Sequence, residues 1–164
     1  ARELLEGAGL GWYELSNYCR PGHENPMNLI YWRGHPYLGL GAGAHSFLPA
    51  GAQHEPEQLG LRTANTRSHT LYMRQIEESG ESIASSEWID PLTHVRERIM
   101  TGLRCGEGVD LKTLRQATGV DARALFAPLI SELEAQGWMI ADDSTLRLTD
   151  AGMLLADDLL VRFF

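Results

Sequence analysis

One short segment gathers residues that suit a flat apolar ligand. The segment NPMNLIYW holds Met27, Asn28, Tyr31 and Trp32. Two adjacent large aromatic side chains cover more apolar area than a surface turn can hide, and their faces suit a flat ligand. The alternative is that both rings fill a core. The segment therefore predicts either a flat, hydrophobic binding site or a buried plug.

A second candidate lies in GLGAGAH, residues 39–45. The spacing Gly39-x-Gly41-x-x-Ala44 fits a degenerate dinucleotide-binding fingerprint, which requires a helix directly after it. Three helix-breaking residues follow instead: Pro49, Gly51 and Pro56. The dinucleotide interpretation therefore fails. Side chains this small still let a flat group lie directly against backbone N–H and C=O groups, the alternative being a tightly packed strand end.

The histidines and cysteines form no recognisable metal or hydrolytic site. No two histidines have metal-ligand spacing on an evident helix, and no nucleophile elbow or Ser-His-Asp set is present. His45 is the least ordinary, because it follows an apolar strand. Cys19 and Cys105 predict two reduced thiols rather than a disulfide or a CxxC metal knuckle. The histidines considered are His23, His35, His45, His54 and His69.

Composition and charge narrow the class of protein. With 43% apolar residues, 22% charged residues and a net charge of −8, the 164-residue chain is typical of a soluble globular protein with one domain or two small ones. The negative charge argues against a nucleic-acid partner, because phosphate backbones are bound by clustered Lys and Arg. No apolar run approaches the roughly 18 residues of a membrane helix, and no leader is visible. We expect a protein of the cytoplasm, or of the lumen of an organelle with a similar redox poise, with no stable membrane span.

The first half is predicted to alternate short elements with loops. ARELLEGAGL begins directly inside an amphipathic helix pattern, which predicts that the sequence starts within a larger architecture. A strand is expected over 11–16 and a loop over 17–26, while 28–32 are either a helical turn or a strand. An apolar strand starts at Tyr37 and passes into the small-residue loop. Residues 48–66 are expected to be irregular, and a helix covers about 68–78.

The second half has strong helix signals. Asp90 followed by Pro91 predicts a helix start, and Val95, Ile99 and Leu103 form its apolar stripe. The order of predicted elements, three helices, a hairpin and a last helix, is that of a winged-helix module. They cover 90–103, 110–119, 121–137, 138–148 and the residues from 148 onward. Eight Lys and Arg against twelve Asp and Glu in residues 90–164 argue against DNA binding.

Five motifs occur in an order that matches a known family. They are YELSNY, PGHENPMNLIYW, YLGLGAGAHS, RTAN and LTDAGMLLAD. In this order they resemble the HemW/HemN group of radical S-adenosylmethionine proteins, and most closely its haem-chaperone branch, HemW. The resemblance covers essentially the whole chain. The ordered set is specific, although each motif alone is a weak signal.

The resemblance implies an α/β fold with an additional, mainly α part. Residues 1–89 would be the C-terminal strands and helices of a partial (β/α) radical-SAM barrel. Residues 90–164 would be a winged-helix-like HemN C-terminal domain that covers the barrel mouth. The earlier barrel strands and the CxxxCxxC motif that holds a [4Fe–4S] cluster do not occur in this sequence. Two isolated cysteines cannot hold that cluster.

The resemblance also gives the opening segment a role. HemW-type members carry HNxxYW, a motif associated with haem binding. This chain reads MNLIYW, so Asn28, Tyr31 and Trp32 match and Met27 stands in place of the histidine. Methionine sulfur also binds haem iron, so the change either keeps an axial bond in altered form or abolishes it. His23 could substitute if the segment is helical.

The leading interpretation is a haem chaperone that hands haem to an acceptor protein, with a dimer possible. By resemblance, Gly41, Ala42, Gly43 and Ala44 would lie beside the adenine of S-adenosylmethionine, and the full-length protein would hold a [4Fe–4S] cluster. We expect the ring pair and the small-residue loop to form two walls of one pocket. One alternative is an oxygen-independent coproporphyrinogen III oxidase. Another is a winged-helix interaction module without activity of its own.

Overall fold

The chain divides between residues 34 and 35 and again between residues 94 and 95. The computed structural model describes residues 2–51, 55 and 57–164, so His54 and Pro56 lie outside the described residues. The first unit combines Ala1–Gly34 with Val95–Phe164, and the second unit is His35–His94. The first unit is thus discontinuous in sequence. The domain boundary between residues 89 and 90 stays a prediction.

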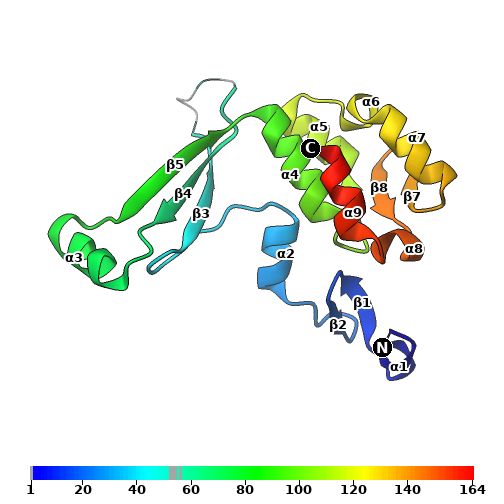
Figure 1. Ribbon diagram of the computed structural model, residues 1–164, viewed down its shortest axis with the longest axis horizontal. Helices are drawn as coiled ribbons and strands as arrows, with labels where there is room; N and C mark the ends of the chain where they lie inside the picture. Colours follow the sequence, from blue (N-terminus) through cyan, green and yellow to red (C-terminus); the bar gives the residue numbers. More distant parts are fainter. Residues whose placement is uncertain (1, 52–54, 56) are drawn as a thin grey trace. The chain divides into compact units, whose positions relative to one another are not determined.

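The N-terminal part of the first unit is a helix, a hairpin and a second helix (Figure 1). These elements are α1 (Arg2–Gly7), β1 (Gly11–Glu14), β2 (Asn17–Cys19) and α2 (Pro26–Trp32). The predicted first helix and first strand are confirmed. The expected loop over 17–26 is wrong at β2, which pairs antiparallel with β1. Three residues are too few to show a period, and the partner strand makes them a strand.

The segment that fits a helix or a strand by sequence is a helix. Asn25 caps α2, because its Oδ1 accepts a hydrogen bond from the Met27 N–H at 2.9 Å. Pro26 lies in the first turn, where its missing N–H leaves no bond unmade. At the other end, the N–H of Arg33 donates to the Leu29 carbonyl at 2.9 Å. The caps therefore fix α2 at seven residues.

The second unit is a three-stranded antiparallel sheet with one helix. Its strands, in the order β3-β4-β5, are β3 (His45–Pro49), β4 (Gly60–Asn65) and β5 (Ile83–Ile89). Helix α3 (His69–Ser79) joins β4 to β5 at one end of the sheet (Figure 1). Ser68 caps α3 by accepting the Leu71 N–H at 3.3 Å, and Gly80 ends it with a φ of 80°. The predicted helix is confirmed.

The strand predictions for the second unit are largely wrong. The strand expected from Tyr37 is reduced to a single bridge with Phe47, and β3 follows the small-residue loop. Strand β4 lies in the segment expected to be irregular. Strand β5 has no sequence signal, since six of its seven residues are exposed and its ladder depends on β4. Antiparallel pairing also differs from the parallel strands of a (β/α) barrel, so the partial barrel stays a prediction.

The C-terminal part of the first unit packs helices around a small sheet. Helix α4 (Pro91–Gly102) begins in the second unit and continues into the first. The elements that follow are β6 (Val109–Asp110), α5 (Leu111–Thr118), α6 (Ala122–Leu125), α7 (Ala127–Ala135), β7 (Met139–Ala141), β8 (Thr145–Leu148), α8 (Asp150–Met153), α9 (Ala156–Leu160) and the 3₁₀ helix η1 (Val161–Phe163). The sheet order is β6-β8-β7, all antiparallel. This order contains the predicted helices and hairpin, and the winged-helix assignment stays a prediction.

The core of this part follows the predicted apolar pattern. Val95, Ile99 and Leu103 are fully buried, as the helical stripe predicts. The single helix predicted over 121–137 is wrong, because the chain breaks between α6 and α7 at Phe126. Pro128 in the first turn of α7 cannot donate a hydrogen bond to the preceding turn, so it starts a new helix. The break leaves Leu125 44% exposed.

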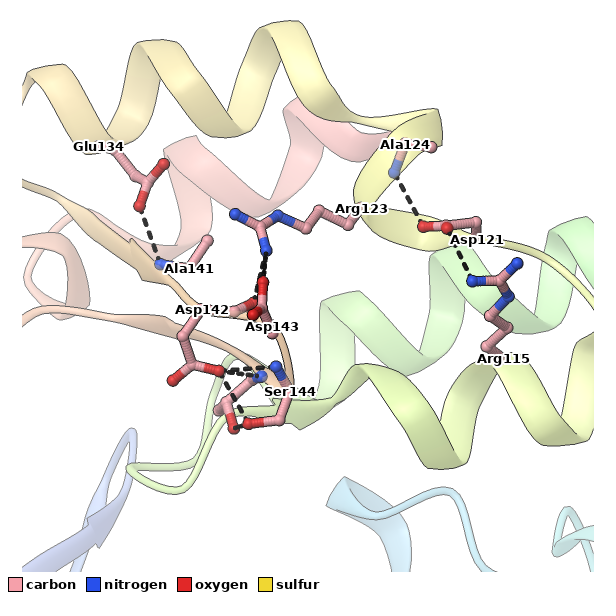
Figure 2. A network of polar contacts seen from close by, with 10 residues as sticks. Arg115, Asp121, Arg123, Ala124, Glu134, Ala141, Asp142, Asp143 and Ser144 are labelled. Carbon is pink, nitrogen blue, oxygen red and sulfur yellow. Dashed lines mark hydrogen bonds and ion pairs between the residues drawn. The ribbon is translucent and has the colours of Figure 1, made fainter.

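The turn of the β7–β8 hairpin is held by acidic side chains (Figure 2). Asp142 Oδ1 accepts the N–H groups of Ser144 and Thr145, both at 2.7 Å. These bonds lower the pKa of Asp142. Arg123 pairs with Asp143 at 2.9 Å and so ties α6 to the turn. Among the described residues, no helix combines the length and apolar character needed to cross a bilayer.

Candidate ligand-binding site

The four motif residues share one side of α2. Successive helical residues are about 100° apart, so Met27, Asn28, Tyr31 and Trp32 span a continuous arc of about 140°. Met27 and Tyr31 are 52% and 44% exposed, while Asn28 and Trp32 are half-buried. Helix formation therefore brings the motif side chains together and leaves one thioether and one ring open to a ligand.

His23 does not lie on this helical face. The prediction that His23 could replace Met27 as a ligand required both residues to lie on one helix, but α2 begins after the Asn25 cap. The N–H of His23 instead donates to the Arg20 carbonyl in a turn, at 3.0 Å. The expected helical relation between His23 and Met27 is therefore wrong, although the side chain of His23 is exposed.

Two arginines of the first unit contact Trp32, one at its ring and one at its backbone carbonyl. The guanidinium carbon of Arg104 lies 6.0 Å from the centroid of the indole ring. Arg98 Nη1 donates to the Trp32 carbonyl at 2.6 Å. The indole Nε1 is buried and has no hydrogen-bond partner in the part of the chain that the structure describes. Tyr31 is thus the more open of the two rings, and Trp32 anchors the helix.

A hollow of about 470 Å³ lies beside α2. Its lining residues are Trp12, Tyr13, Glu24, Leu29, Arg33, Gly106 and Glu107. By the same spacing of about 100° per residue, Leu29 and Arg33 lie on the side of α2 roughly opposite the motif residues, so the hollow is on the other side of the helix from Met27 and Tyr31. Sequence reasoning missed Trp12 and Tyr13, although two adjacent aromatics directly before ELSNY are the same signal as Tyr31 and Trp32. The hollow has the volume of a small-ligand pocket.

The charges around the hollow are largely paired. Arg33 binds Glu107 through two bonds, Nε to Oε1 at 2.7 Å and Nη2 to Oε2 at 2.8 Å. This pairing raises the pKa of Arg33. The pKa of Glu24 is lowered, because backbone N–H groups, including that of Gly22 at 3.2 Å, donate to its carboxylate. Glu24 therefore leaves the hollow with a surplus negative charge, and a carboxylate ligand would have to displace Glu107 from Arg33.

The small-residue loop of the second unit is a turn rather than a strand end. Gly41 and Gly43 have φ values of 106° and 71°, which a side chain would strain. The Gly41 N–H donates to the Tyr72 hydroxyl at 3.2 Å, and the Gly43 N–H to the Thr66 carbonyl at 2.8 Å. Several of the peptide groups expected to meet a ligand are therefore already bonded, while Ala42 is exposed.

Asn65, the last residue of RTAN, explains why this loop holds its shape. Its Nδ2 donates to the Gly41 carbonyl at 3.0 Å, and its N–H donates to the Ala44 carbonyl at 2.9 Å. One residue at the end of β4 thus fixes both ends of the turn. The predicted pocket between this loop and the ring pair stays a prediction.

Comparison with known proteins shows which proteins this chain resembles. Residues 89–155 match the HemN C-terminal domain. The chain is 29% identical to "Heme chaperone HemW" of Bacillus subtilis over 97% of its length, and 31% identical to "Radical S-adenosyl methionine domain-containing protein 1, mitochondrial" of Danio rerio over 98%. These matches cover 39% and 36% of the relatives. The resemblance to the HemW/HemN group is confirmed, and the chain spans less than half the length of these relatives.

A solved structure shares the fold. Coproporphyrinogen III oxidase (HemN) from Escherichia coli, described as a radical SAM enzyme, superposes with a TM-score of 0.68 at 18% identity, over 98% of this chain and 38% of that one. At this identity the likeness shows the fold alone. The mixed α/β class is therefore confirmed.

The HemN C-terminal domain contributes to the surroundings of α2 but does not fit a cluster. Arg98, Arg104, Gly106 and Glu107 all fall within the matched residues. Burial raises the pKa of Cys105 to about 12, so its thiol is protonated at neutral pH and is a poor metal ligand. No group of three or more His, Cys, Asp or Glu side chains among the described residues could hold a metal ion. The described residues thus do not fit a [4Fe–4S] cluster.

Proposed function

We propose that this chain belongs to a haem chaperone of the HemW type and that α2 contacts the haem. The observation that carries the proposal is that the MNLIYW residues share one side of a capped helix on which Met27 and Tyr31 are exposed. The chain is also similar to HemW over 97% of its length. The relatives' name describes a haem chaperone. Haem is a flat, largely apolar macrocycle, and exposed aromatic and thioether groups suit its face.

The residues of α2 would take different parts in binding. Tyr31 offers an exposed ring to the macrocycle, and Asn28 offers a half-buried amide on the same side. Met27 is exposed enough for its sulfur to approach the iron, and methionine is a known axial ligand that raises the reduction potential. Trp32 supports the helix from its covered side. His23 remains a second axial candidate from the preceding turn.

The full-length protein would supply what this chain does not. We propose that the whole polypeptide holds a [4Fe–4S] cluster and S-adenosylmethionine in a partial (β/α) barrel. The Gly41–Ala44 turn would lie near the adenine, where the exposed Ala42 leaves the backbone open to a flat group. Residues 90–164 would act as a winged-helix-like cover. A haem-acceptor protein, a dimer and a cytoplasmic location complete the proposal.

Haem titration of the full-length natural protein tests the proposed site. The triple variant Met27→Ala, Tyr31→Ala, Trp32→Ala should lose at least about tenfold in haem affinity, since 1.4 kcal/mol of lost contact is a factor of ten. Met73→Ala, an exposed methionine on α3, is the matched control and should bind normally. Met27→His should shift the Soret band if position 27 reaches the iron. An unchanged Soret spectrum and affinity in the triple variant would remove α2 from the haem site.

The coproporphyrinogen III oxidase interpretation is not adopted. Its support in known structures is a likeness at 18% identity, which carries the fold and no activity. The relatives that match at 29–35% identity include several named haem chaperones. Decarboxylation of a porphyrinogen by the reconstituted full-length protein would reverse this choice, whereas haem retention without turnover would support the chaperone.

A further inference from the structure

Helix α2 is not stable by itself. It has seven residues, none of them buried, whereas isolated helices shorter than roughly 12–15 residues are marginal in water. Its Asn25 cap satisfies a donor at the N-terminal end only. The helix that carries the proposed haem motif must therefore be held by contacts from other segments, and these contacts decide how well the motif is positioned.

The C-terminal end of α2 is closed by a side chain from α4. The N–H of Arg33 uses the Leu29 carbonyl and the N–H of Gly34 uses the Tyr31 carbonyl, at 2.9 and 3.0 Å. The Trp32 carbonyl instead accepts a hydrogen bond from Arg98 Nη1 at 2.6 Å. A guanidinium at this end also interacts favourably with the helix dipole. Arg98 therefore serves as a C-terminal cap supplied from a distant part of the sequence.

The side chain of Arg98 is held in position by its neighbours Thr101 and Gly34. Its Nη1 also donates to Thr101 Oγ1 at 3.2 Å, one turn along α4. Gly34 leaves the space that the guanidinium fills, because a Cβ added there would lie 2.5 Å from Arg98 Cδ. Burial lowers the pKa of Arg98, but a guanidinium stays charged at neutral pH. The glycine and the arginine thus fit as a pair.

Two further contacts from the same stretch of chain act on the same end of α2. Arg104 lies over the Trp32 ring, and Glu107 holds Arg33 through both carboxylate oxygens. All three side chains, Arg98, Arg104 and Glu107, belong to the HemN C-terminal domain. Three side chains of this domain therefore contact the end of α2 where Tyr31 and Trp32 lie.

We propose that Arg98 is the positioning residue of the haem site: from the HemN C-terminal domain it caps α2 and fixes the orientation of Tyr31 and Trp32. The proposal rests on the proposed function, because it gives the HemN C-terminal domain a part in haem binding. Arg98 touches the helix backbone and acts on haem only through α2. Loss of the cap lets the last turn of α2 fray. The motif residues must then become ordered when haem binds, and the lost conformational entropy lowers the affinity.

The test compares Arg98→Met, Arg98→Lys and the control Arg115→Met in the full-length protein. Arg115 is an exposed arginine of α5 in the same domain, paired with Asp121 at 3.1 Å. Hydrogen exchange should accelerate at least about tenfold in residues 29–34 of Arg98→Met and stay unchanged in the β7–β8 hairpin. Haem affinity should fall about five- to tenfold with a broadened Soret band. Arg98→Lys, which keeps the charge and can still donate a hydrogen bond, should recover part of both effects, and Arg115→Met should show neither.

The two readouts separate the possible failures. If Arg98→Met leaves exchange in residues 29–34 unchanged, Arg98 does not hold α2 and the proposal is wrong. If exchange accelerates but haem affinity and spectrum stay those of the parent, α2 is held by Arg98 but is not the haem site. If the parent itself binds no haem, the proposed function fails independently of the exchange result. Should Arg98→Met not fold, Arg98→Lys alone decides by the same two measurements.

Discussion

The C-terminal part of the first unit and the second unit differ in what stabilises them. The core cluster, from Val95 to Phe163, lies entirely in the first unit. Among the described residues of the second unit, the buried ones are Ser46, Gly60, Ser82 and Ile89. Apolar burial contributes roughly 25 cal/mol per Å², so the first region has a large internal source of stability. The second depends on strand pairing, caps and the Asn65 contacts.

This difference separates two tasks. The region with the core is also the region that matches the HemN C-terminal domain, and its Arg98 holds the end of α2 by a hydrogen bond. The region with little core carries the small-residue turn, whose peptide groups are held by hydrogen bonds. Ligand-binding loops are commonly drawn from the less stable parts of a protein. The comparison predicts that the two regions respond very differently to matched substitutions.

Truncation of an aliphatic side chain should show the largest contrast. Leu133 of α7 is fully buried, and Leu133→Ala should lower the free energy of unfolding by about 2–5 kcal/mol, because it removes apolar contacts and leaves a cavity. Ile83 of β5 is 51% exposed, and Ile83→Ala should cost less than about 1 kcal/mol. Urea unfolding followed by circular dichroism measures both. Similar losses at the two positions would mean that the second unit has a core of its own.

Two glycines, one in each region, lie equally close to a backbone carbonyl oxygen and can be compared. A Cβ added at Gly152 of α8 would overlap the carbonyl oxygen of Trp138, and one added at Gly39 would overlap that of His45. The Trp138 carbonyl is fixed by the Thr149 N–H at 3.0 Å, within a packed core. Gly152→Ala should therefore cost about 1–3 kcal/mol, as over-packing does.

Gly39→Ala should cost less than Gly152→Ala. Its neighbours Leu38 and Leu40 are 67% and 82% exposed, so the chain there has room to shift. Differential scanning calorimetry of both variants gives the two changes in melting temperature. A larger drop for Gly39→Ala would show that the small-residue turn is the more rigid of the two places.

The same contrast explains what the sequence could predict. The helices α3, α4 and α5 follow from signals within a few residues of their ends, such as Ser68 with Gly80 and Asp110 with Gly119. Strands β4 and β5 could not be predicted, because buried and exposed residues do not alternate along them and each strand depends on a partner strand. The break at Phe126 was predictable in principle, since Pro128 is visible in the sequence.

The candidate site was predictable only in part. The MNLIYW residues are adjacent in sequence, so one helix suffices to bring them together. The hollow beside α2 combines residues of β1, α2 and the chain after α4, and no local pattern shows that Trp12 meets Gly106. Arg98 carries no local signal either, since its partner is a backbone carbonyl far away in sequence. Contacts between segments far apart in the sequence cannot be predicted from local sequence patterns.

The helix caps give the smallest expected effects and a difference in pH dependence. Asp110 caps α5 by accepting the Thr113 N–H at 2.9 Å, and this bond lowers the pKa of its carboxyl. Ser68 caps α3 in the second unit with a hydroxyl that does not titrate. At pH 7, Asp110→Ala and Ser68→Ala should each cost about 1 kcal/mol or less.

Acid should distinguish the two caps. Because the folded pKa of Asp110 is depressed, its contribution is present above the unfolded pKa of about 3.9 and is lost as the pH falls through the folded pKa. The cost of Asp110→Ala should therefore shrink towards pH 3, while that of Ser68→Ala stays constant. Native-state hydrogen exchange of α5 and α3 between pH 7 and pH 3 measures the two costs separately. A pH-independent cost for Asp110→Ala would mean that its charge adds nothing to the cap, and that both regions cap their helices by hydrogen bonding alone.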